Sequence, residues 1–497
     1  MNPQTRHFFE NYWGIIALFV WAVLIFAFQL VSFSSYGIEE NAARGLLLNW
    51  TVSDNIINPV VIFGVPDFRA LLFAPVGAYW PGSMIAAKVM AVLFMALAAI
   101  MLYRWAQKHS TAESAMIATA LFLVSPAVLN QIDSLGAGAY LLLGFLICAW
   151  LDQAYRAKPR YFGGWYFSQM LLVAILFTIH PLAIAYPLVL AWRWFRFPDS
   201  HKTSAHIYIG IVVAMILAFS LKGGWENVQW FSNPIFALAS ALDGGALWSV
   251  ADISWTVGII TAIFVITVII ADFKFLTENL VGQLLLASTL VGLLAADKAW
   301  ATVALVLVFY RGTHLLIIAN ERLGKHSLVG QRGIVIALSF VMATFFMMEA
   351  KNHHYTLKAE ILSPEDELIR ELADVASDES KAFRAASQWP GRTMLAAKRD
   401  VLPLPPAMDN PESFYPHLQS VTHIIFNQNL PQNQALANNI AELTGATETI
   451  AFMKAGVIVE VRDHKVEQKH YRPPVDTGSK DQQTTHDTNQ EHHTTGD

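Results

Sequence analysis

Long apolar stretches alternate with short polar loops over the first 350 residues of the chain. A helix that crosses the hydrocarbon core of a bilayer needs roughly 17–25 mostly apolar residues. This criterion predicts eleven spans, at about 12–34, 84–105, 114–130, 135–151, 165–179, 181–196, 205–221, 253–271, 281–296, 299–318 and 333–349. The first is too long for the core of a signal peptide, so we expect it to be retained. The pattern therefore predicts a polytopic α-helical membrane protein.

From about residue 351 the pattern becomes that of a soluble domain. It predicts a helix over 364–388, a buried strand over 421–426, a helix over 432–443 and a hairpin over 448–461. We therefore expect a small α/β domain over 351–472, which is large enough to have its own core. Residues 473–497 are rich in Thr, Gln, His and Asp, a composition that predicts disorder.

Composition agrees with a membrane protein, because 55% of the residues are hydrophobic and only 14% are charged. The net charge of −5 argues against binding of nucleic acid or another polyanion. The single cysteine, Cys148, lies in an apolar run and allows no intrachain disulfide.

Lysine and arginine fall in alternate loops of the predicted array. The charged loops contain Arg104 and Lys108; Arg156, Lys158 and Arg160; Arg193, Arg196 and Lys202; and Arg322, Lys325 and Arg332. The positive-inside rule then places the N-terminus in the cytoplasm. With eleven spans, we expect the C-terminal domain to lie on the extracytoplasmic (periplasmic) side of the inner membrane.

The first outer loop, residues 35–83, opens with the adjacent carboxylates Glu39 and Glu40. Residues 36–50 have apolar positions at helical spacing, which predicts an amphipathic helix at the membrane surface. Adjacent acids where a chain leaves the bilayer are costly unless they bind a cation or take part in chemistry. The alternative is that both acids only favour the positive end of this helix. Arg44 stands four residues after Glu40, a spacing that allows an ion pair.

Two further outer segments contain candidate binding residues. Arg69 is suited to a phosphate group because a guanidinium presents several donors and stays charged. The alternative is a structural ion pair between Asp67 and Arg69. Asp133 is a candidate acceptor or metal ligand, with Mg²⁺ or Mn²⁺ as the candidate cofactor, although a lone Asp at a helix junction is as often a cap. His180, at another outer turn, is a candidate phosphate contact or merely a turn residue.

These residues resemble the GT-C membrane glycosyltransferases that use polyprenyl-phosphate sugars, in particular relatives of the protein O-mannosyltransferases and the lipid A aminoarabinose transferase. In that family the first outer loop begins with an acidic pair followed by an arginine, as Glu39, Glu40 and Arg44 do here. The usual first acid is Asp, so Glu39 departs from the pattern. The stretch from Gly64 to Pro75 matches the family only loosely, and His180-Pro181 replaces a Lys-Gly-Pro.

The resemblance implies an inverting sugar transfer at the outer face of the membrane. Glu39 or Glu40 would act as general base on a hydroxyl of a glycan, lipid or protein acceptor. Arg69, with Arg44 and His180, would bind the donor phosphate, and Asp67 or Asp133 would hold the acceptor or a metal. Two alternative hypotheses to sugar transfer remain: a transporter or flippase of lipid-linked sugars, and a degenerate family member with a role in envelope assembly.

Overall fold

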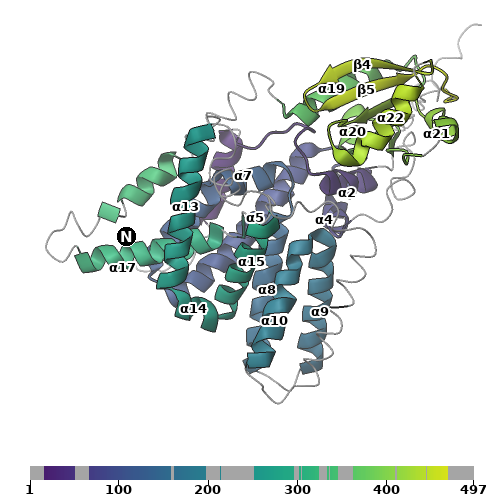
Figure 1. Cartoon of the computed structure of the whole chain (residues 1–497). Helices are drawn as coiled ribbons and strands as arrows, with labels where there is room; N and C mark the ends of the chain where they lie inside the picture. The colour runs from purple at the N-terminus through teal and green to yellow at the C-terminus, as the bar shows by residue number, and fades with distance from the viewer. Residues whose placement is uncertain are drawn as a thin grey trace, which may run out of the picture.

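The computed structural model describes residues 16–28, 30–50, 67–157, 162–196, 213, 251–295, 302–303, 305–323, 333–334, 336–344, 362–408, 411–443 and 445–467. The predicted span at 205–221 and the predicted disordered tail at 473–497 lie outside these residues, apart from residue 213. In the described part, helices form a bundle over the first two thirds of the chain, and one mixed sheet follows (Figure 1).

A helix over Ile16–Ala27 lies in the first predicted span. Most of the following helices lie within the other predicted spans, whereas α2 and α4 lie in the predicted outer loop. These helices are α2 (Glu40–Trp50), α4 (Arg69–Tyr79), α5 (Met84–His109), α6 (Ala112–Val124), α7 (Pro126–Asp133), α8 (Gly138–Ala157), α9 (Phe162–Ile179), η2 (Pro181–Ile184), α10 (Ala185–Arg196), α13 (Ala251–Ala271), α14 (Phe273–Glu278), α15 (Leu280–Ala295), the π-helix η3 (Leu307–Gly312) and α17 (Thr313–Leu323). Phe167, Ile263 and Ile270 project apolar side chains outward from this bundle. Such exposure suits a surface that faces lipid.

Among the described helices, α5 is long and apolar enough to cross a membrane by itself. Helices α6 and α7 meet that criterion together but are bent by 51° at Ser125. The sequence predicted one span at 114–130, and the structure shows that the helix over this stretch is broken at Ser125. Ser125 precedes Pro126 and has extended backbone angles, because the proline ring disfavours a helical conformation in the preceding residue. The total of eleven spans stays a prediction.

Residues 362–467 contain a five-stranded mixed sheet with the strand order β2-β1-β3-β5-β4. Strand β1 pairs in parallel with β2 and β3, whereas β5 pairs antiparallel with β3 and β4. The strands are β1 (Ala385–Ser387), β2 (Val401–Pro403), β3 (His423–Phe426), β4 (Thr447–Met453) and β5 (Gly456–Val461). The accompanying helices are α19 (Pro364–Ala376), α20 (Pro390–Ala397), α21 (Pro411–Leu418) and α22 (Gln434–Glu442).

The helix predicted over 364–388 ends earlier than expected, at Ala376. Its start is as predicted: the Ser363 hydroxyl accepts a hydrogen bond from the Asp366 N–H, and Pro364 occupies the first turn. After the helix, the Asp378 carboxylate accepts hydrogen bonds from the N–H and hydroxyl of Ser380, which closes a turn. Residues 385–387 then form the strand β1 in place of helix.

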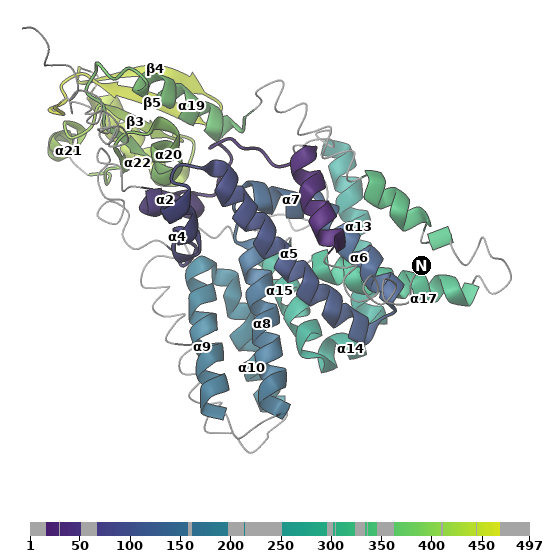
Figure 2. The same cartoon turned by 180° about the vertical axis from the view of Figure 1, so that it is seen from behind.

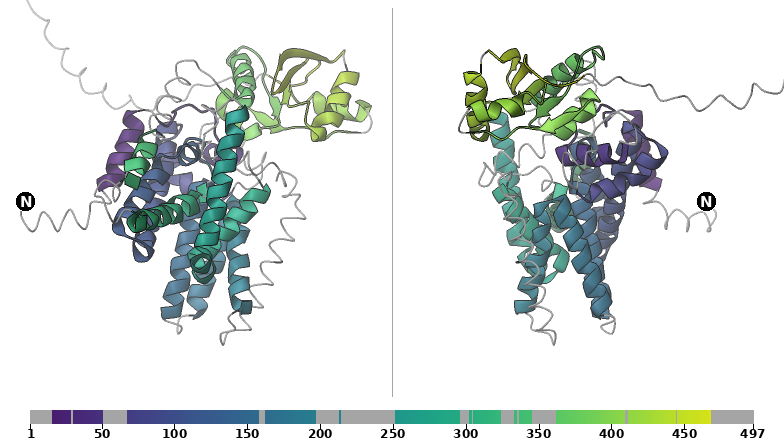
Figure 3. Two further views of the ribbon diagram at one scale, coloured as in Figure 1. Left: turned by 60° about the vertical axis from the view of Figure 1, so that its left-hand side comes forward. Right: turned by 90° about the vertical axis from the view of Figure 1, so that its right-hand side faces the viewer.

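The sheet region lies at one end of the bundle (Figures 1 and 2). Helix α20 packs against α2, and α2 also packs against α4. Figure 3 shows the same arrangement from two further sides. Helix α2 therefore lies between the terminal domain and the spanning helices, and the predicted site lies at that junction.

Candidate active site

Glu39 stands immediately before α2, where the backbone fixes it from two sides. Its N–H donates to the Ser134 carbonyl at 2.8 Å, and its own carbonyl accepts from the Ala43 N–H at 2.9 Å. The first contact joins the outer loop to the turn between α7 and α8. The start of α2 is thus held against a second pair of helices before any side chain is considered.

The Arg69 guanidinium joins the carboxylates of Glu39 and Asp67. It is fully buried, and its Nη1 and Nη2 donate to Glu39 Oε2 and Oε1 at 2.8 and 2.9 Å. Its Nε and Nη2 donate to Asp67 Oδ2 at 2.9 and 2.6 Å, and Nη1 also reaches the Leu135 carbonyl at 3.2 Å. These contacts occupy all five N–H donors of an arginine. The structural ion pair between Asp67 and Arg69, which the sequence offered as an alternative to phosphate binding, is present. Glu39 is a second acidic partner of the same arginine.

Exposure to solvent distinguishes the Glu39 carboxylate from the Asp67 carboxylate. Two acids and one guanidinium leave the trio with one net negative charge. The Asp67 side chain is 5% exposed, and burial raises the pKa of its carboxyl although Arg69 opposes that shift. The Glu39 side chain is 34% exposed. Glu39 is therefore the member of the trio that a substrate can reach.

An unusual turn supplies the last acceptor of Arg69. Leu135 has a φ of +54°, in the left-handed region that a branched side chain rarely occupies. The turn is closed by the Gly136 N–H, which donates to the Gln131 carbonyl, and by the Gly138 N–H, which donates to Gln131 Oε1. Such strain persists only where surrounding contacts enforce it. Its effect is to aim the Leu135 carbonyl at the guanidinium.

Asp133 lies beside this turn but is already paired with a cation. Lys88, buried in α5, donates from Nζ to Asp133 Oδ1 at 2.9 Å and to the Asp133 carbonyl. The Ser32 N–H donates to the same Oδ1 at 2.8 Å. Among the residues that the structure describes, no three His, Cys, Asp or Glu side chains are grouped to hold a metal. A Mg²⁺ or Mn²⁺ ion at Asp133 would have to compete with Lys88, so this donor set does not fit a resident metal.

Glu40 faces away from Arg69 and contacts the terminal domain. Its Oε1 and Oε2 accept hydrogen bonds from the N–H groups of Gly391 and Arg392 at 2.7 and 3.0 Å. Oε1 also accepts from Arg44 Nε at 2.8 Å, the pair that the sequence spacing predicts. Pro390, Gly391 and Arg392 form the first turn of α20, whose amides have no partner within their own helix. Glu40 therefore caps a helix of the terminal domain.

Substitution of Glu40 by Ala is expected to release the first turn of α20. A carboxylate that accepts two backbone N–H bonds contributes about 1.5–3 kcal/mol for each charge-assisted bond. Hydrogen exchange of the Gly391 and Arg392 amides should rise by about tenfold or more in Glu40→Ala. Glu448→Gln is the matched control, because it disrupts an exposed pair with Arg462 in the same domain. Unchanged protection at both amides would contradict this contact.

Gly391 is required by the same close approach. A Cβ at this position would lie 2.8 Å from Arg44 Cγ and 2.9 Å from Glu40 Oε1. An alanine there would force the side chains of Arg44 and Glu40 to shift and would disturb the contact between α2 and α20. Arg392 secures α20 to α19 through a 2.6 Å ion pair with Asp366.

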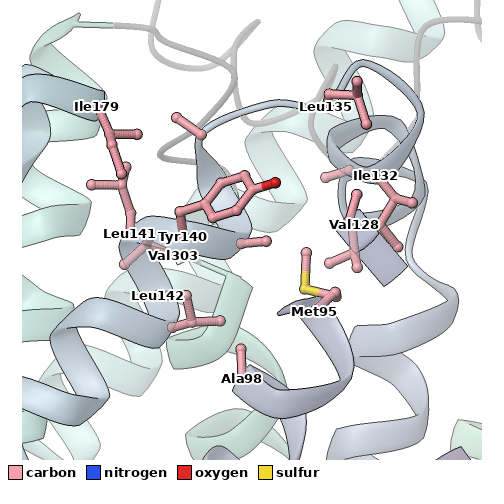
Figure 4. Close-up of a cluster of buried hydrophobic side chains, with 14 of the residues drawn as sticks. Met95, Ala98, Val128, Ile132, Leu135, Tyr140, Leu141, Leu142, Ile179 and Val303 are labelled. Atoms are coloured by element: carbon pink, nitrogen blue, oxygen red, sulfur yellow. The ribbon is translucent and has the colours of Figure 1, made fainter. Parts of the chain in front are cut away.

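Tyr140, near the start of α8, is buried and has a hydroxyl without a hydrogen-bond partner. Its ring packs against Phe94 with the ring centroids 5.0 Å apart. In Figure 4 the hydroxyl points toward the side chains of Leu135, Ile132 and Met95. The hydroxyl is thus aimed at the turn that faces Arg69, and an unpaired buried hydroxyl is rare enough to require an explanation.

The remaining predicted residues lie at other elements. Arg44 lies one turn into α2 and pairs with Glu40. His180 begins η2, where its N–H donates to the Leu176 carbonyl at 2.9 Å. The roles of both in donor binding stay predictions.

Sequence reasoning missed Lys88, Tyr140 and Gly391. Lys88 carried a usable signal, because an ionisable residue inside an apolar span usually pairs or functions. Tyr140 and Gly391 carried none, since a tyrosine near a span end and a glycine in a soluble domain are both ordinary.

Comparison by sequence finds no matching protein-family model and no matching curated protein. Comparison by structure finds ArnT from Cupriavidus metallidurans, in the apo state and bound to undecaprenyl phosphate, each with a TM-score of 0.51 and 12% identity over 90% of this chain and 98% of that one. It also finds the oligosaccharyltransferase AglB from Archaeoglobus fulgidus, in complex with an inhibitory peptide and a dolichol-phosphate. That structure has a TM-score of 0.53 and 12% identity over 86% of this chain and 71% of that one. At this identity the likeness concerns the fold, and it confirms the predicted GT-C architecture.

Proposed function

We propose that this GT-C chain is a glycosyltransferase that moves a sugar from a polyprenyl-phosphate donor to an acceptor hydroxyl, with inversion. The observation that carries the proposal is the Glu39 carboxylate, which is held by Arg69 yet is one-third exposed. The fold shared with ArnT and AglB supports it, because structures of those proteins contain undecaprenyl phosphate and dolichol-phosphate respectively. The acceptor class, whether glycan, lipid or protein, is left open.

In the proposed reaction Glu39 is the general base. As the acceptor oxygen attacks the anomeric carbon, the Glu39 carboxylate takes the hydroxyl proton, and the bond from that carbon to the phosphate oxygen breaks. The polyprenyl phosphate leaves with the electron pair. General-base catalysis by a positioned side chain contributes about 10²–10⁴-fold in rate. Arg69 acts here as a positioning residue, because it fixes both oxygens of Glu39.

The donor phosphate needs a cation other than Arg69 in this geometry. All five Arg69 donors are used, so Arg69 binds phosphate only if it releases Asp67 or Glu39. Arg44 and His180 remain the proposed phosphate contacts. No step is assigned to a metal, because Lys88 and Ser32 already donate to Asp133.

Lipid mass spectrometry on cells that lack the protein tests this function. The cells are complemented with the parent chain or with Glu39→Gln. We expect a polyprenyl-phosphate sugar to accumulate in the deletion strain and to disappear only with the parent chain. The mass of the accumulated lipid then identifies the donor sugar. Identical lipid pools in all three strains would contradict the proposed transferase activity and favour a non-catalytic role in the envelope.

Tyr140→Phe tests whether the orphan hydroxyl serves substrate. A buried hydroxyl without a partner costs about 1–3 kcal/mol, so its removal should leave stability unchanged or higher. If a substrate oxygen is its partner, kcat/KM should fall by about tenfold. Tyr186→Phe is the matched control, because the buried Tyr186 hydroxyl donates to the Cys148 carbonyl at 3.0 Å. The control should lower stability and spare kcat/KM. Full activity in Tyr140→Phe would exclude the contact.

A further inference from the structure

A second buried arginine lies at the end of the bundle away from the sheet. Arg311 belongs to η3, a π-helical turn between residue 307 and α17, and is 5% exposed. A π-turn inserts an extra residue into a helix and is frequent at functional sites. Arg311 contacts Asp272 and Phe275 at the start of α14. Figure 1 shows α14 as the short helix between α13 and α15.

The contacts of Arg311 leave part of its guanidinium free. Nε donates to Asp272, and the guanidinium lies 3.8 Å from the ring centroid of Phe275. His109, at the end of α5, packs edge-on against the same ring at 5.3 Å. Among the described residues, none accepts a hydrogen bond from the two terminal nitrogens of Arg311, which pairs with Asp272 through Nε. Arg69, in contrast, has every donor occupied.

His314, one turn beyond Arg311, has a polar atom without a hydrogen-bond partner. Its Nδ1 is buried and has no hydrogen-bond partner among the described residues. Buried polar groups are nearly always hydrogen-bonded in folded proteins. The terminal nitrogens of Arg311 and the Nδ1 of His314, three residues further along the helix, therefore remain available to a ligand.

The ligand chemistry follows from the donors. Two terminal guanidinium nitrogens match two oxygens of a phosphate, and an imidazole N–H can donate to a third. Helix α14 places an exposed Phe273 next to Lys274, a combination suited to the level where lipid headgroups begin. Lys108, in the last turn of α5, adds positive charge at the same end.

We propose that Arg311 and His314 bind the phosphate of an anionic phospholipid headgroup in the leaflet opposite the Glu39 site. The Phe275 ring supports the guanidinium from one face, and Asp272 holds its Nε edge. The remaining edge is left for the lipid phosphate. This inference does not depend on the proposed sugar transfer.

Native mass spectrometry of the full-length protein in detergent tests the proposal. Phosphatidylglycerol is titrated into the parent chain and into the double variant Asp272→Asn/Arg311→Gln, which removes both charges and leaves no buried ion alone. His314→Ala is a second, milder variant. Arg322→Gln is the matched control, because Arg322 is an exposed arginine in the last turn of α17. Phosphatidylcholine serves as the zwitterionic comparison, and inorganic phosphate is added as a competitor.

The phosphatidylglycerol molecule that binds with the highest affinity should bind at least tenfold more weakly to the double variant and to His314→Ala than to the parent chain. Its affinity for Arg322→Gln should equal that for the parent chain. If inorganic phosphate does not displace the lipid, the lipid is the source of the bound phosphate. Displacement at millimolar inorganic phosphate would overturn the lipid assignment in favour of a soluble phosphate. Equal affinity in the parent and both cluster variants would overturn the site itself, as would equal binding of phosphatidylcholine.

Discussion

Glu39→Gln is expected to lower the rate of sugar transfer by at least about 100-fold, while the protein still folds and binds donor. The amide keeps the size of the side chain and one acceptor for Arg69, but it cannot take a proton from an attacking hydroxyl. The measurement is kcat of purified protein at saturating polyprenyl-phosphate sugar, with donor affinity determined separately. The loss should appear in kcat and leave the donor dissociation constant within a few-fold.

Glu40→Gln is the matched variant for this experiment, because it changes the adjacent carboxylate in the same way. Glu40 faces α20, so its substitution should leave proton transfer intact and affect the terminal domain. A 100-fold loss in Glu40→Gln together with normal turnover in Glu39→Gln would exchange the two roles. Normal turnover in both variants would show that neither Glu39 nor Glu40 acts as the general base.

Arg69→Met is expected to prevent stable folding. The substitution leaves the Glu39 and Asp67 carboxylates without their shared cation and the Leu135 carbonyl without its side-chain donor. Removal of one partner from a buried ion pair costs about 3–5 kcal/mol, a large share of the 5–15 kcal/mol typical of a folded domain. Size-exclusion chromatography of the solubilised protein should show a sharp loss of the monodisperse species.

A compensated variant separates stability from chemistry at this site. Glu39→Gln/Asp67→Asn/Arg69→Met removes all three charges and should recover most of the folded protein, yet remain inactive for lack of the base. Arg69→Met by itself gives the decisive result. If it folds normally and loses only donor affinity, Arg69 is a phosphate ligand, as the sequence suggested, and its contacts with Glu39 are secondary.

The sequence predicted the local part of the site better than the tertiary part. The Glu40–Arg44 pair follows from helical spacing, and Asp67 and Arg69 are two residues apart. Arg69 and Glu39 are 30 positions apart, and Glu40 and Gly391 are 351 apart. Hydropathy and spacing carry no information about which distant segments meet. The sequence therefore grouped Glu39 with Glu40 as one functional pair, although the two side chains contact different parts of the molecule.

The fold shows the same division. Apolar periodicity predicted α5, α8 and α9 because each has a long uniform run. Strands β1 and β2 are three residues each, too short for alternation to be visible. The break at Ser125 depended on one proline within an otherwise helical pattern, and hydropathy does not register backbone conformation.

The contact between Glu40 and the first turn of α20 has an evolutionary consequence. A carboxylate on one domain that caps a helix of another ties two distant codons to a common selective pressure. A lineage that lost the terminal domain would be free to change position 40, while position 39 would stay constrained by its proposed role as general base. Lineages that keep the domain should retain an acid at position 40 together with glycine at 391. Retention of both acids would thus reflect the contact with the terminal domain as well as the proposed reaction.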